Sequence, residues 1–348
     1  MPRLRRIDCS GPGLTRRRRG RGFEYLDEAG RRITDPEILA RIKGLVIPPA
    51  WRDVWICPHR MGHIQATGTD AAGRKQYRYH DRWRERRDRE KFDSMVGFAR
   101  ALPELRRRVE RDLSSDGLGP ERLLACAARL LDRGFFRIGS EDYAEENDTY
   151  GLATMRKRHA TVNGELVVFD YESKGGGRRV QAIADSEVAD LVRTLKRRRG
   201  GGEELLAFKR RGRWVDVKSA DINSYLRNAT GGDFTAKDFR TWNATVLAAV
   251  ALAVSGEATA RSKRARKRAI TRAVRETARY LGNTPAVCRA SYIDPRVFDR
   301  FEGGLTIGGV LPELAGDAST WPDVQGAIEE AVLDLIEREL SPAIEKVA

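Results

Sequence analysis

The chain changes its sequence pattern near residue 90, and this change limits the folds that it can adopt. Residues 1–90 contain short β-like runs, DVWICP, HIQATG and KQYRYH, which are separated by Gly- and Pro-containing segments such as GTDAAGRK. The segment Arg82–Lys91, RWRERRDREK, then shows helical charge patterning, and helices are predicted to dominate from Phe92 onward. Because 348 residues exceed what one hydrophobic core usually serves, we predict two domains, residues 1–90 and 91–348.

The second region is predicted to be mostly helical, with a β insertion at Arg158–Ala184. In GPERLLACAARLLDRGFF, apolar residues recur at helical spacing between Leu123 and Leu131, which describes one buried helix face. HATVNGELVVFDY predicts a β-hairpin because Asn163-Gly164 is a strong turn signal. The turn ESKGGGRR then leads to a third predicted strand, RVQAIA. These patterns give the coarse outline of an α+β protein.

Charge narrows the choice of partner but does not identify the activity. Lys and Arg number 65 against 50 Asp and Glu, a formal net charge of +15, which predicts a polyanionic partner. Ribosomal or membrane-surface binding would give the same sign. The first hundred residues and Arg261–Arg279 are strongly basic, whereas the tail after Leu311 is acidic. One hypothesis is that the acidic segment PDVQGAIEEAVLDLIEREL shields a basic groove.

The sequence gives little indication of a membrane span, a disulfide framework or a metal site. The longest apolar run, Val246–Val254, is much shorter than the roughly 18 residues of a membrane span, and no apolar segment follows MPRLRRIDCSG to make a secretory signal. The four cysteines lie far apart, and the cluster of Cys57, His59 and His63 lacks a fourth metal ligand. We therefore expect a cytosolic protein that requires no metal.

Tyr292 in ASYIDPRVFD raises the question of function, because it follows a predicted helix end and precedes a proline. Alone, it would be interpreted as a half-buried turn residue. A phenol is mostly protonated at neutral pH, since its ordinary pKa is about 10. To cleave a phosphodiester, it would need fixed cations on the non-bridging oxygens and an acid for the departing 5′-oxygen. The rest of the chain would have to supply these groups.

Candidates for these groups lie upstream of the tyrosine. Arginine can bond a phosphate bidentately, and Arg137 follows a predicted helix end while Arg240 begins a buried helix. Lys174 lies at a Gly-rich hairpin tip, where neighbouring cations could lower its pKa and make it an acid. Asn283 directly follows the helix-ending Gly282.

Each candidate also has a purely structural interpretation. Arg137 could satisfy terminal helix carbonyls, and Asn283 could cap the helix that precedes it. Arg240 could form an ion pair with Asp238, and Lys174 could be a solvated loop charge. Taken singly, none of these residues indicates a catalytic site.

Taken together, their order and spacing resemble the type IB DNA topoisomerases, specifically the small poxvirus-like bacterial branch. The resemblance extends from about Val46 to about Glu302. It is carried by VIPPAWRDVWICP, GRKQYRYH, FFRIGSEDYAEENDTYGLATMRKRHATV, YESKGGGRR, TAKDFRTWNATVLAA and YLGNTPAVCRASYIDP. It implies an α+β fold, in which an antiparallel β-rich domain, residues 1–90, clamps DNA. A larger, mostly helical catalytic domain, residues 91–348, would carry a three-stranded antiparallel sheet.

The resemblance also implies a set of functional residues. Tyr77 and Tyr79 alternate with Arg78 and so share one strand face, where aromatic packing is the alternative to DNA contact. Poxvirus and nuclear members have His where Asn283 stands; an asparagine can donate a neutral hydrogen bond but cannot add charge or shuttle a proton. The implied catalytic residues are Arg137, Lys174, Arg240, Asn283 and Tyr292, and the implied DNA-binding residues are Gln76, Tyr77, Tyr79 and Lys237.

The implied activity is relaxation of supercoiled duplex DNA through a transient 3′-phosphotyrosyl link, strand rotation and religation. It requires neither ATP nor a metal nor another cofactor, and the sequence contains no GxxxxGK(S/T) motif. The implied protein is a monomer in the cytoplasm, associated with the nucleoid. Two alternatives stay open: a tyrosine site-specific recombinase, which shares the chemistry, and a non-enzymatic basic DNA-binding protein.

Overall fold

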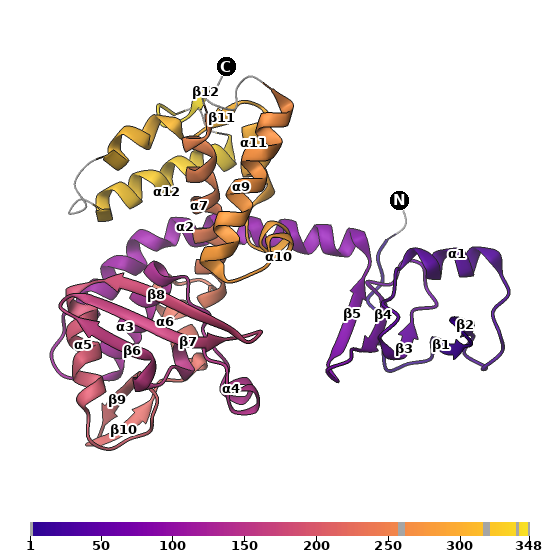
Figure 1. Ribbon diagram of the computed structural model, residues 1–348, viewed down its shortest axis with the longest axis horizontal. Helices are drawn as coiled ribbons and strands as arrows, with labels where there is room; N and C mark the ends of the chain where they lie inside the picture. The colour runs from indigo at the N-terminus through magenta and orange to yellow at the C-terminus, as the bar shows by residue number, and fades with distance from the viewer. Residues whose placement is uncertain (1–2, 257–261, 316–320, 339–340, 347–348) are drawn as a thin grey trace. The chain divides into compact units, whose positions relative to one another are not determined.

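The computed structural model describes residues 3–256, 262–315, 321–338 and 341–346. The chain forms two compact units, Met1–Lys91 and Phe92–Ala348. Helix α2, Asp81–Leu113, begins in the first unit and continues into the second (Figure 1). The first unit contains a five-stranded antiparallel sheet, and the second combines many helices with a three-stranded antiparallel sheet. The predicted α+β fold class is therefore confirmed.

In the first unit, the sheet and helix α1, Pro36–Gly44, pack together around a small hydrophobic core. Its strand order is β2-β1-β3-β4-β5. Asp35 fixes the start of α1 by accepting the amides of Glu37 and Ile38 at 2.8 and 3.2 Å. The buried core consists of Leu14, Ile42, Val54, Ile56 and Ala66. The strands are β1 Leu14–Arg19, β2 Gly22–Leu26, β3 Arg52–Ile56, β4 Ile64–Thr69 and β5 Lys75–Tyr79.

The second unit is mostly helical. After α2, its α-helices are α3 Pro120–Gly134, α4 Glu141–Asn147, α5 Ser186–Arg197, α6 Ser219–Thr230, α7 Ala236–Val254, α9 Lys263–Leu281, α10 Pro285–Ser291, α11 Pro295–Glu302 and α12 Trp321–Glu337. Its 3₁₀-helices are η1 Leu152–Thr154, η2 Lys157–His159 and η3 Gly308–Ala315. Its strands are β6 Ala160–Asn163, β7 Leu166–Ser173, β8 Gly177–Ala184, β9 Ala207–Arg210, β10 Arg213–Asp216, β11 Leu305–Thr306 and β12 Glu345–Lys346. None of the helices in the described ranges combines the length and the hydropathy that a bilayer span requires.

The three-stranded sheet has the order β6-β7-β8. Its first turn lies at the predicted Asn163-Gly164, where Gly164 has a φ of 60° and Asn163 pairs with Leu166. Alternate residues of β7, such as Phe169 and Tyr171, are buried, so one face of the sheet packs into the unit. The β7–β8 hairpin then projects its Gly-rich tip from this packed base.

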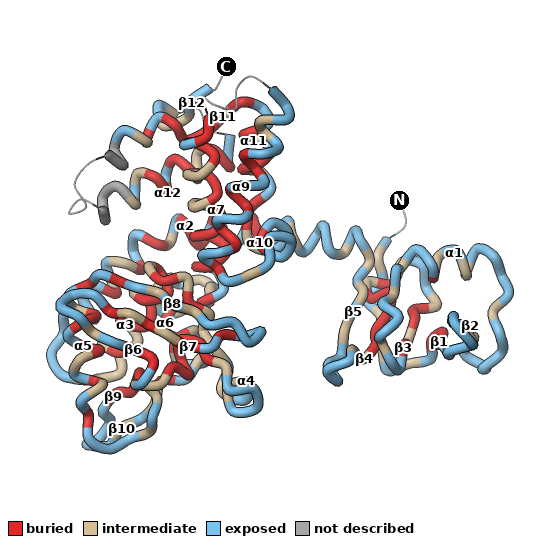
Figure 2. Tube along the Cα trace, viewed as in Figure 1, coloured by how far each residue is buried: buried red, intermediate tan, exposed pale blue. Residues whose placement is uncertain are grey.

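Helix α7 lies at the centre of the second unit (Figure 2). Phe239 and Trp242 are almost fully buried, and so are alanines on several faces of the helix. Helices α3, α6, α9, α11 and α12 contact it. A helix that is apolar on nearly every side is stable only when it is surrounded. Arg240, in its second turn, is therefore carried by a helix that its neighbours hold in place.

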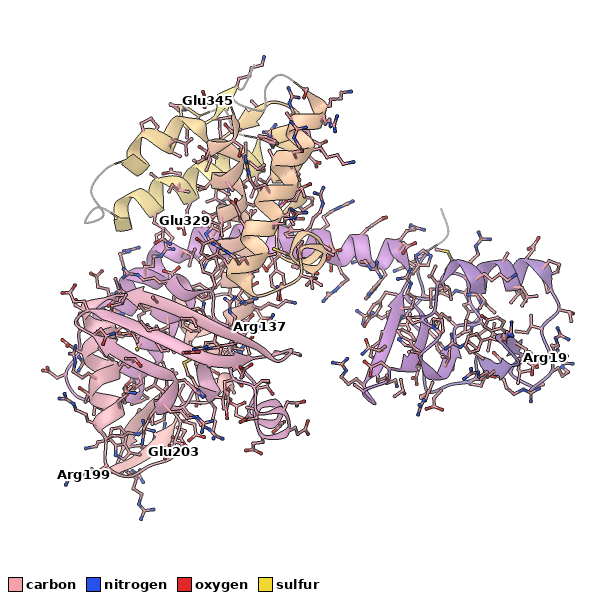
Figure 3. The ribbon with its side chains drawn as sticks, in the orientation of Figure 1. Arg19, Arg137, Arg199, Glu203, Glu329 and Glu345 are labelled. Carbon is pink, nitrogen blue, oxygen red and sulfur yellow. The ribbon has the colours of Figure 1, made fainter. Side chains whose placement is uncertain are left out.

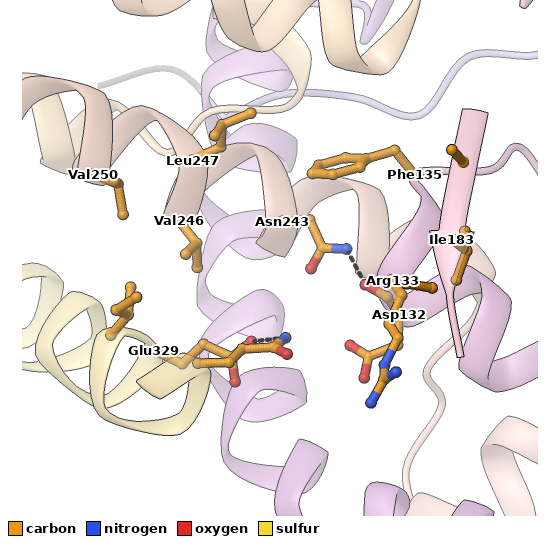
Figure 4. Close-up of a pocket in the computed structure, with 13 residues that line it drawn as sticks. Asp132, Arg133, Phe135, Ile183, Asn243, Val246, Leu247, Val250 and Glu329 are labelled. Carbon is orange, nitrogen blue, oxygen red and sulfur yellow. Dashed lines mark hydrogen bonds between the residues drawn. The ribbon is translucent and has the colours of Figure 1, made fainter. Parts of the chain in front are cut away.

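Helix α12 is an integral part of the second unit. Its apolar face, which includes Val332, is buried. Arg106 of α2 donates hydrogen bonds to both Asp132 of α3 and Glu329 of α12, at 2.6–2.9 Å. Figure 4 shows Asp132 and Glu329 on a shared cavity, which Val246 and Leu247 of α7 also line. The apolar face of this acidic helix and Glu329 are thus used inside the unit. The hypothesis that the acidic segment shields a basic groove stays a prediction.

We expect Arg106→Ala to lower the free energy of unfolding by about 3 kcal/mol, because it would leave two carboxylates, 8% and 9% exposed, without their cation. Urea denaturation at neutral pH measures this change. Arg107→Ala is a matched control, since that side chain is 74% exposed and pairs with an exposed Glu104; we expect it to change stability by less than about 0.5 kcal/mol. Equal losses in the two variants would contradict the role given to Arg106.

Candidate active site

A cavity of about 390 Å³ in the second unit is lined by residues that are far apart in the sequence. Arg137, Lys174, Arg240 and Tyr292 all face it, as does Lys237. Figure 3 shows Arg137 near the β7–β8 hairpin, which carries Lys174. The other lining residues are Ile138, Gly139, Ser140, Thr149, Tyr150 and Ala236. Four of the five predicted catalytic residues are thus brought together around one space.

Arg240 is fixed in the wall of this cavity. It is only 4% exposed, and its two terminal nitrogens donate to the carbonyls of Phe135 at 2.6 Å and Leu281 at 2.9 Å. Its Nε is buried and has no hydrogen-bond partner in the described part of the chain. Asp238, which could have paired with it, instead accepts the Thr235 amide at 2.8 Å and so caps α7.

Arg137 reaches the cavity from the segment that follows α3. The chain leaves α3 through Phe135, which has a left-handed φ of 54°, and the Arg137 carbonyl then accepts the Leu152 amide at 2.8 Å. The Arg137 side chain donates from Nη2 to the Gly282 carbonyl at 3.2 Å and to Oδ1 of Asn283. Arg137 therefore does satisfy a terminal helix carbonyl, but one that belongs to α9.

Asn283 does not line the cavity itself but is joined to it through Arg137. Gly282 ends α9 in the left-handed region, with φ 64°, and the Asn283 amide then bonds back to the Ala278 carbonyl at 3.0 Å. The capping interpretation is thus correct for its backbone. Its side-chain Nδ2 is buried and lacks a hydrogen-bond partner among the described residues.

Tyr292 is half-buried at the end of α10, and helix α7 positions its backbone. The Thr245 hydroxyl accepts the Asp294 amide at 3.1 Å, and its single proton has two carbonyls within reach, that of Thr241 at 2.9 Å and that of Tyr292 at 3.3 Å. The guanidinium carbon of Arg240 lies 5.2 Å from the centre of the Tyr292 ring. Because Arg240 and Thr245 both belong to α7, one helix sets the arginine and the tyrosine relative to each other.

The electrostatics of this pair lower the pKa of the Tyr292 phenol. Burial alone would raise the pKa of Tyr292, but Arg240 and then Arg137 stabilise the phenolate, and the net pKa lies below its usual value. The Asn283 amide adds to this effect, although its Nδ2 does not reach hydrogen-bonding geometry with any described group. Burial, with Arg137 nearby, lowers the pKa of Arg240 to about 10. At neutral pH Arg240 remains a cation.

Lys174 and Lys237 add positive charge at the mouth of the cavity. Lys174 is exposed at the tip between β7 and β8, where Gly175 and Gly176 have φ values of 99° and 75°, conformations that favour glycine. Lys237 lies in the first turn of α7. Cations from a hairpin and a helix thus face the same space as Tyr292.

The remaining predicted DNA-binding residues lie in the first unit, on β5. Tyr77 and Tyr79 are 43% and 36% exposed, and their rings stack at 6.0 Å. Gln76 donates to the Asp70 carboxylate at 2.9 Å. The two tyrosines pack on each other outside the core. Their rings are therefore engaged in aromatic packing and are still exposed to a ligand. Their contact with DNA stays a prediction.

Several residues around the site were missed by sequence reasoning. Thr149 and Tyr150 line the cavity, and the Thr149 hydroxyl is buried without a hydrogen-bond partner among the described residues. Arg179 of β8 donates to carbonyls at the end of α9, and Thr245 holds the turn after Tyr292. The alternation of side chains along a strand could have predicted that Arg178 and Arg179 point to opposite faces of the sheet. No local sequence pattern indicates which residues either side chain contacts.

The Cys57 cluster has hydrogen-bonding roles in the first unit. The Cys57 thiol donates to the His59 carbonyl at 3.3 Å, and Nδ1 of His63 accepts the Ile7 amide at 3.1 Å. Within the ranges that the structure describes, no group of three or more His, Cys, Asp or Glu side chains is placed to hold a metal ion.

Comparison with known families identifies the class of protein. Residues 80–302 match the family model described as the catalytic core of eukaryotic DNA topoisomerase I. Residues 22–70 match the N-terminal domain of bacterial DNA topoisomerase IB. The chain therefore belongs to the type IB DNA topoisomerases, which are DNA-binding isomerases. This membership confirms the predicted family and enzyme class and does not support the non-enzymatic alternative.

Individual relatives agree with this assignment. DNA topoisomerase 1B of Acanthamoeba polyphaga mimivirus is 29% identical over 294 residues, which cover 81% of this chain and 85% of the viral protein. DNA topoisomerase 1 of Candidozyma auris is 31% identical over 164 residues, 45% of this chain and 20% of that protein. DNA topoisomerase 1 of Candida albicans is 29% identical over 161 residues, 45% of this chain and 19% of that protein. The chain thus spans most of the viral relative but only about a fifth of the fungal ones.

We expect the Tyr292 phenol to titrate below pH 10, the ordinary value, because Arg240 and Arg137 stabilise its phenolate more than burial disfavours it. As pH rises, Tyr292 should therefore ionise before an unperturbed tyrosine. The measurement is the difference in phenolate ultraviolet absorbance between the wild type and Tyr292→Phe across a pH titration. Arg240→Gln should move this titration to higher pH.

Arg289→Gln is the matched control for that titration. Arg289 is an arginine of α10 whose guanidinium lies over the Phe298 ring at 4.6 Å, so its removal should leave the Tyr292 titration in place. A wild-type titration at or above pH 10, or equal shifts in the two variants, would show that Arg240 does not control the phenol.

Proposed function

We propose that this protein relaxes supercoiled duplex DNA by transient cleavage of one strand, with Tyr292 as the nucleophile. The observation that carries the proposal is the convergence of Tyr292, Arg137, Arg240 and Lys174 on one cavity. The cavity combines a phenol of lowered pKa with cations from three different elements. A phosphodiester is the substrate that such a set of groups fits, since its transition state gathers negative charge on the non-bridging oxygens.

In the cleavage step, the Tyr292 oxygen attacks the phosphorus and the bond to the 5′-oxygen breaks. The phenolic proton leaves to solvent, which the lowered pKa of Tyr292 favours. The departing 5′-oxygen takes a proton from Lys174, whose hairpin tip lets it approach the strand. The products are a 3′-phosphotyrosyl link and a free 5′-hydroxyl, so atoms and charges balance.

Arg137, Arg240 and Asn283 stabilise the transition state in this proposal. The two arginines can bond the non-bridging oxygens with guanidinium forks that stay charged at neutral pH. Asn283 would add a neutral hydrogen bond. Its Nδ2 and the Nε of Arg240 are buried donors without hydrogen-bond partners in the described ranges, and such donors are stabilised when an acceptor arrives. A bound phosphate would supply that acceptor.

The second half of the reaction reverses the first. The free end rotates about the intact strand, torsional strain dissipates, and the 5′-hydroxyl attacks the phosphotyrosine to reseal the backbone. The phosphotyrosyl bond conserves the energy of the phosphodiester, so the reaction as proposed consumes no ATP and assigns no step to a metal. Family membership favours this outcome over site-specific recombination.

The two parts of the chain would have different roles on duplex DNA. Residues 1–90 would act as a clamp on the duplex, through Gln76, Tyr77 and Tyr79 of β5, while residues 91–348 would carry the chemistry. Lys237 would contact the backbone beside the scissile phosphate. The net charge of +15 supports binding dominated by phosphate contacts, which weakens steeply with salt. We propose that a monomer does this in the cytoplasm, at the nucleoid.

Tyr292→Phe should abolish relaxation of supercoiled plasmid while leaving DNA affinity unchanged, because only the nucleophilic oxygen is lost. The test is plasmid relaxation together with denaturation of the enzyme on end-labelled DNA. Wild-type protein should be trapped on the 3′ end of the cut strand. Tyr280→Phe, an exposed tyrosine of α9, is the control and should relax plasmid normally. Relaxation by Tyr292→Phe would remove the nucleophile assignment.

Lys174→Ala should slow single-turnover cleavage by roughly 100- to 10,000-fold, the usual contribution of a general acid. A 5′-bridging phosphorothiolate should restore much of this rate, because a thiolate leaves without a proton. Arg137→Ala should also cleave slowly but should gain little from the same substrate, since its loss affects the phosphate oxygens. Failure of the sulfur substrate to rescue Lys174→Ala would assign the acid elsewhere.

A further inference from the structure

The end of helix α9 is capped by arginines in a way that the catalytic assignments do not explain. Arg179 donates to the carbonyls of Arg279, at 2.9 Å, and Tyr280. The next two carbonyls accept from the proposed catalytic residues: Arg240 donates to Leu281 and Arg137 to Gly282. Four consecutive carbonyls of one helix end thus receive guanidinium groups from β8, α7 and the segment after α3.

We propose that Arg179 is a positioning residue for the cleavage reaction, which holds the end of α9 so that Arg137, Asn283 and Arg240 meet the phosphate correctly. This inference rests on the proposed function. The carbonyl end of a helix carries partial negative charge and lacks backbone partners. Arg179 donates to two of its carbonyls, those of Arg279, which also accepts the Gly282 amide at 3.3 Å, and Tyr280. Those carbonyls therefore do not compete for the guanidinium groups that the phosphate needs.

The packing of Arg179 also fixes the turn that carries Asn283. A Cβ atom added to Gly282 would lie 2.7 Å from Nη1 of Arg179, so the guanidinium lies directly against this turn. Asn283 is the next residue, and its Oδ1 accepts from Arg137. A displacement of the helix end would therefore move Asn283 and, through it, Arg137.

Hydrogen bonds to neighbouring elements hold the strand that carries Arg179 in place. Arg179 lies on β8 opposite Tyr171 of β7, whose hydroxyl donates to Gln181 Oε1 at 2.8 Å. Gln181 in turn donates to the Gly134 carbonyl at the end of α3. The strand is thus tied to α3 two residues beyond Arg179, and the arginine connects this sheet to the end of α9. A direct role on the scissile phosphate is disfavoured because Arg179, unlike Arg137 and Arg240, does not line the cavity and instead donates to the carbonyls of α9.

Arg178 provides a matched control on the same strand. Its side chain is 70% exposed and pairs with Asp170, with Nε to Oδ1 at 2.8 Å. It lies on the opposite face of β8 from Arg179 because side chains alternate along a strand. Loss of either arginine removes one positive charge from the same hairpin, so a purely electrostatic effect on DNA binding should be similar in the two variants.

The experiment measures single-turnover cleavage of a duplex oligonucleotide and the dissociation constant for the same duplex. Arg179→Ala should cleave about 10- to 100-fold more slowly, the size expected for misplaced catalytic groups, with affinity close to that of Arg178→Ala. Arg178→Ala should cleave at the wild-type rate. Arg179→Lys should recover part of the rate because an ammonium can still donate to these carbonyls. It also provides a folded variant if Arg179→Ala proves unstable.

A 5′-bridging phosphorothiolate separates this role from an effect on Lys174, which lies on the same hairpin. Arg179→Ala should not be rescued by it, because the defect concerns the phosphate oxygens. Three results for Arg179→Ala would each overturn the inference. They are cleavage at the wild-type rate, a loss of DNA affinity with no loss of cleavage rate, and full rescue by the sulfur substrate. If Tyr292→Phe still cleaves, the proposed function itself fails; if only Arg179→Ala is normal, the positioning role alone fails.

Discussion

The carbonyl end of helix α9 is the constraint on which the candidate active site depends. The last carbonyls of a helix lack partners within the helix, and here the carbonyls from Arg279 to Gly282 accept hydrogen bonds from Arg179, Arg240 and Arg137. These arginines come from a strand, a buried helix and an irregular segment. One local feature, the helix ending at Gly282, therefore collects side chains that are distant in the sequence. Two of the three also belong to the predicted catalytic set.

This arrangement concentrates positive charge before any substrate is present. Burial, Arg137 and Arg179 all lower the pKa of Arg240, which means that the folded protein holds this cation at a cost in free energy. The carbonyls offset part of the cost through partial charges, and a phosphate carrying a full negative charge would offset more. Arg240 and Arg137 also lower the pKa of Tyr292. In the proposed function, affinity for phosphate and activation of the phenol would thus have one electrostatic origin.

Local signals in the sequence were sufficient for much of the fold. The Asn163-Gly164 turn, the end of α9 at Gly282 and the buried helix that begins near Arg240 all lie where the sequence predicts them, because each depends on neighbouring residues. The roles of single side chains were less predictable. Asp238 is used as a helix cap, while Arg137 is both a carbonyl partner and a lining residue of the cavity.

Contacts between elements could not be predicted in this way. Thr245 positions Tyr292 only because α7 passes beside the turn after α10, and nothing in the sequence near Thr245 indicates that neighbour. Arg179 and Arg178 are adjacent and chemically identical. The first contacts the end of α9 and the second an exposed aspartate, and only the placement of β8 against α9 distinguishes them.

The neutral side chain of Asn283 is suited to this concentration of charge. Its Oδ1 accepts from Arg137 while its Nδ2 is left as a buried donor, so one amide can join an arginine to a phosphate oxygen. A protonated imidazole has only donors and could not accept from Arg137. It would also add a cation beside Arg240, whose pKa is already lowered by its cationic neighbours. An asparagine therefore keeps the hydrogen-bonded connection between the end of α9 and Arg137 without further charge repulsion. In the proposed reaction, Arg137 and Arg240 would then supply the positive charge for the phosphate.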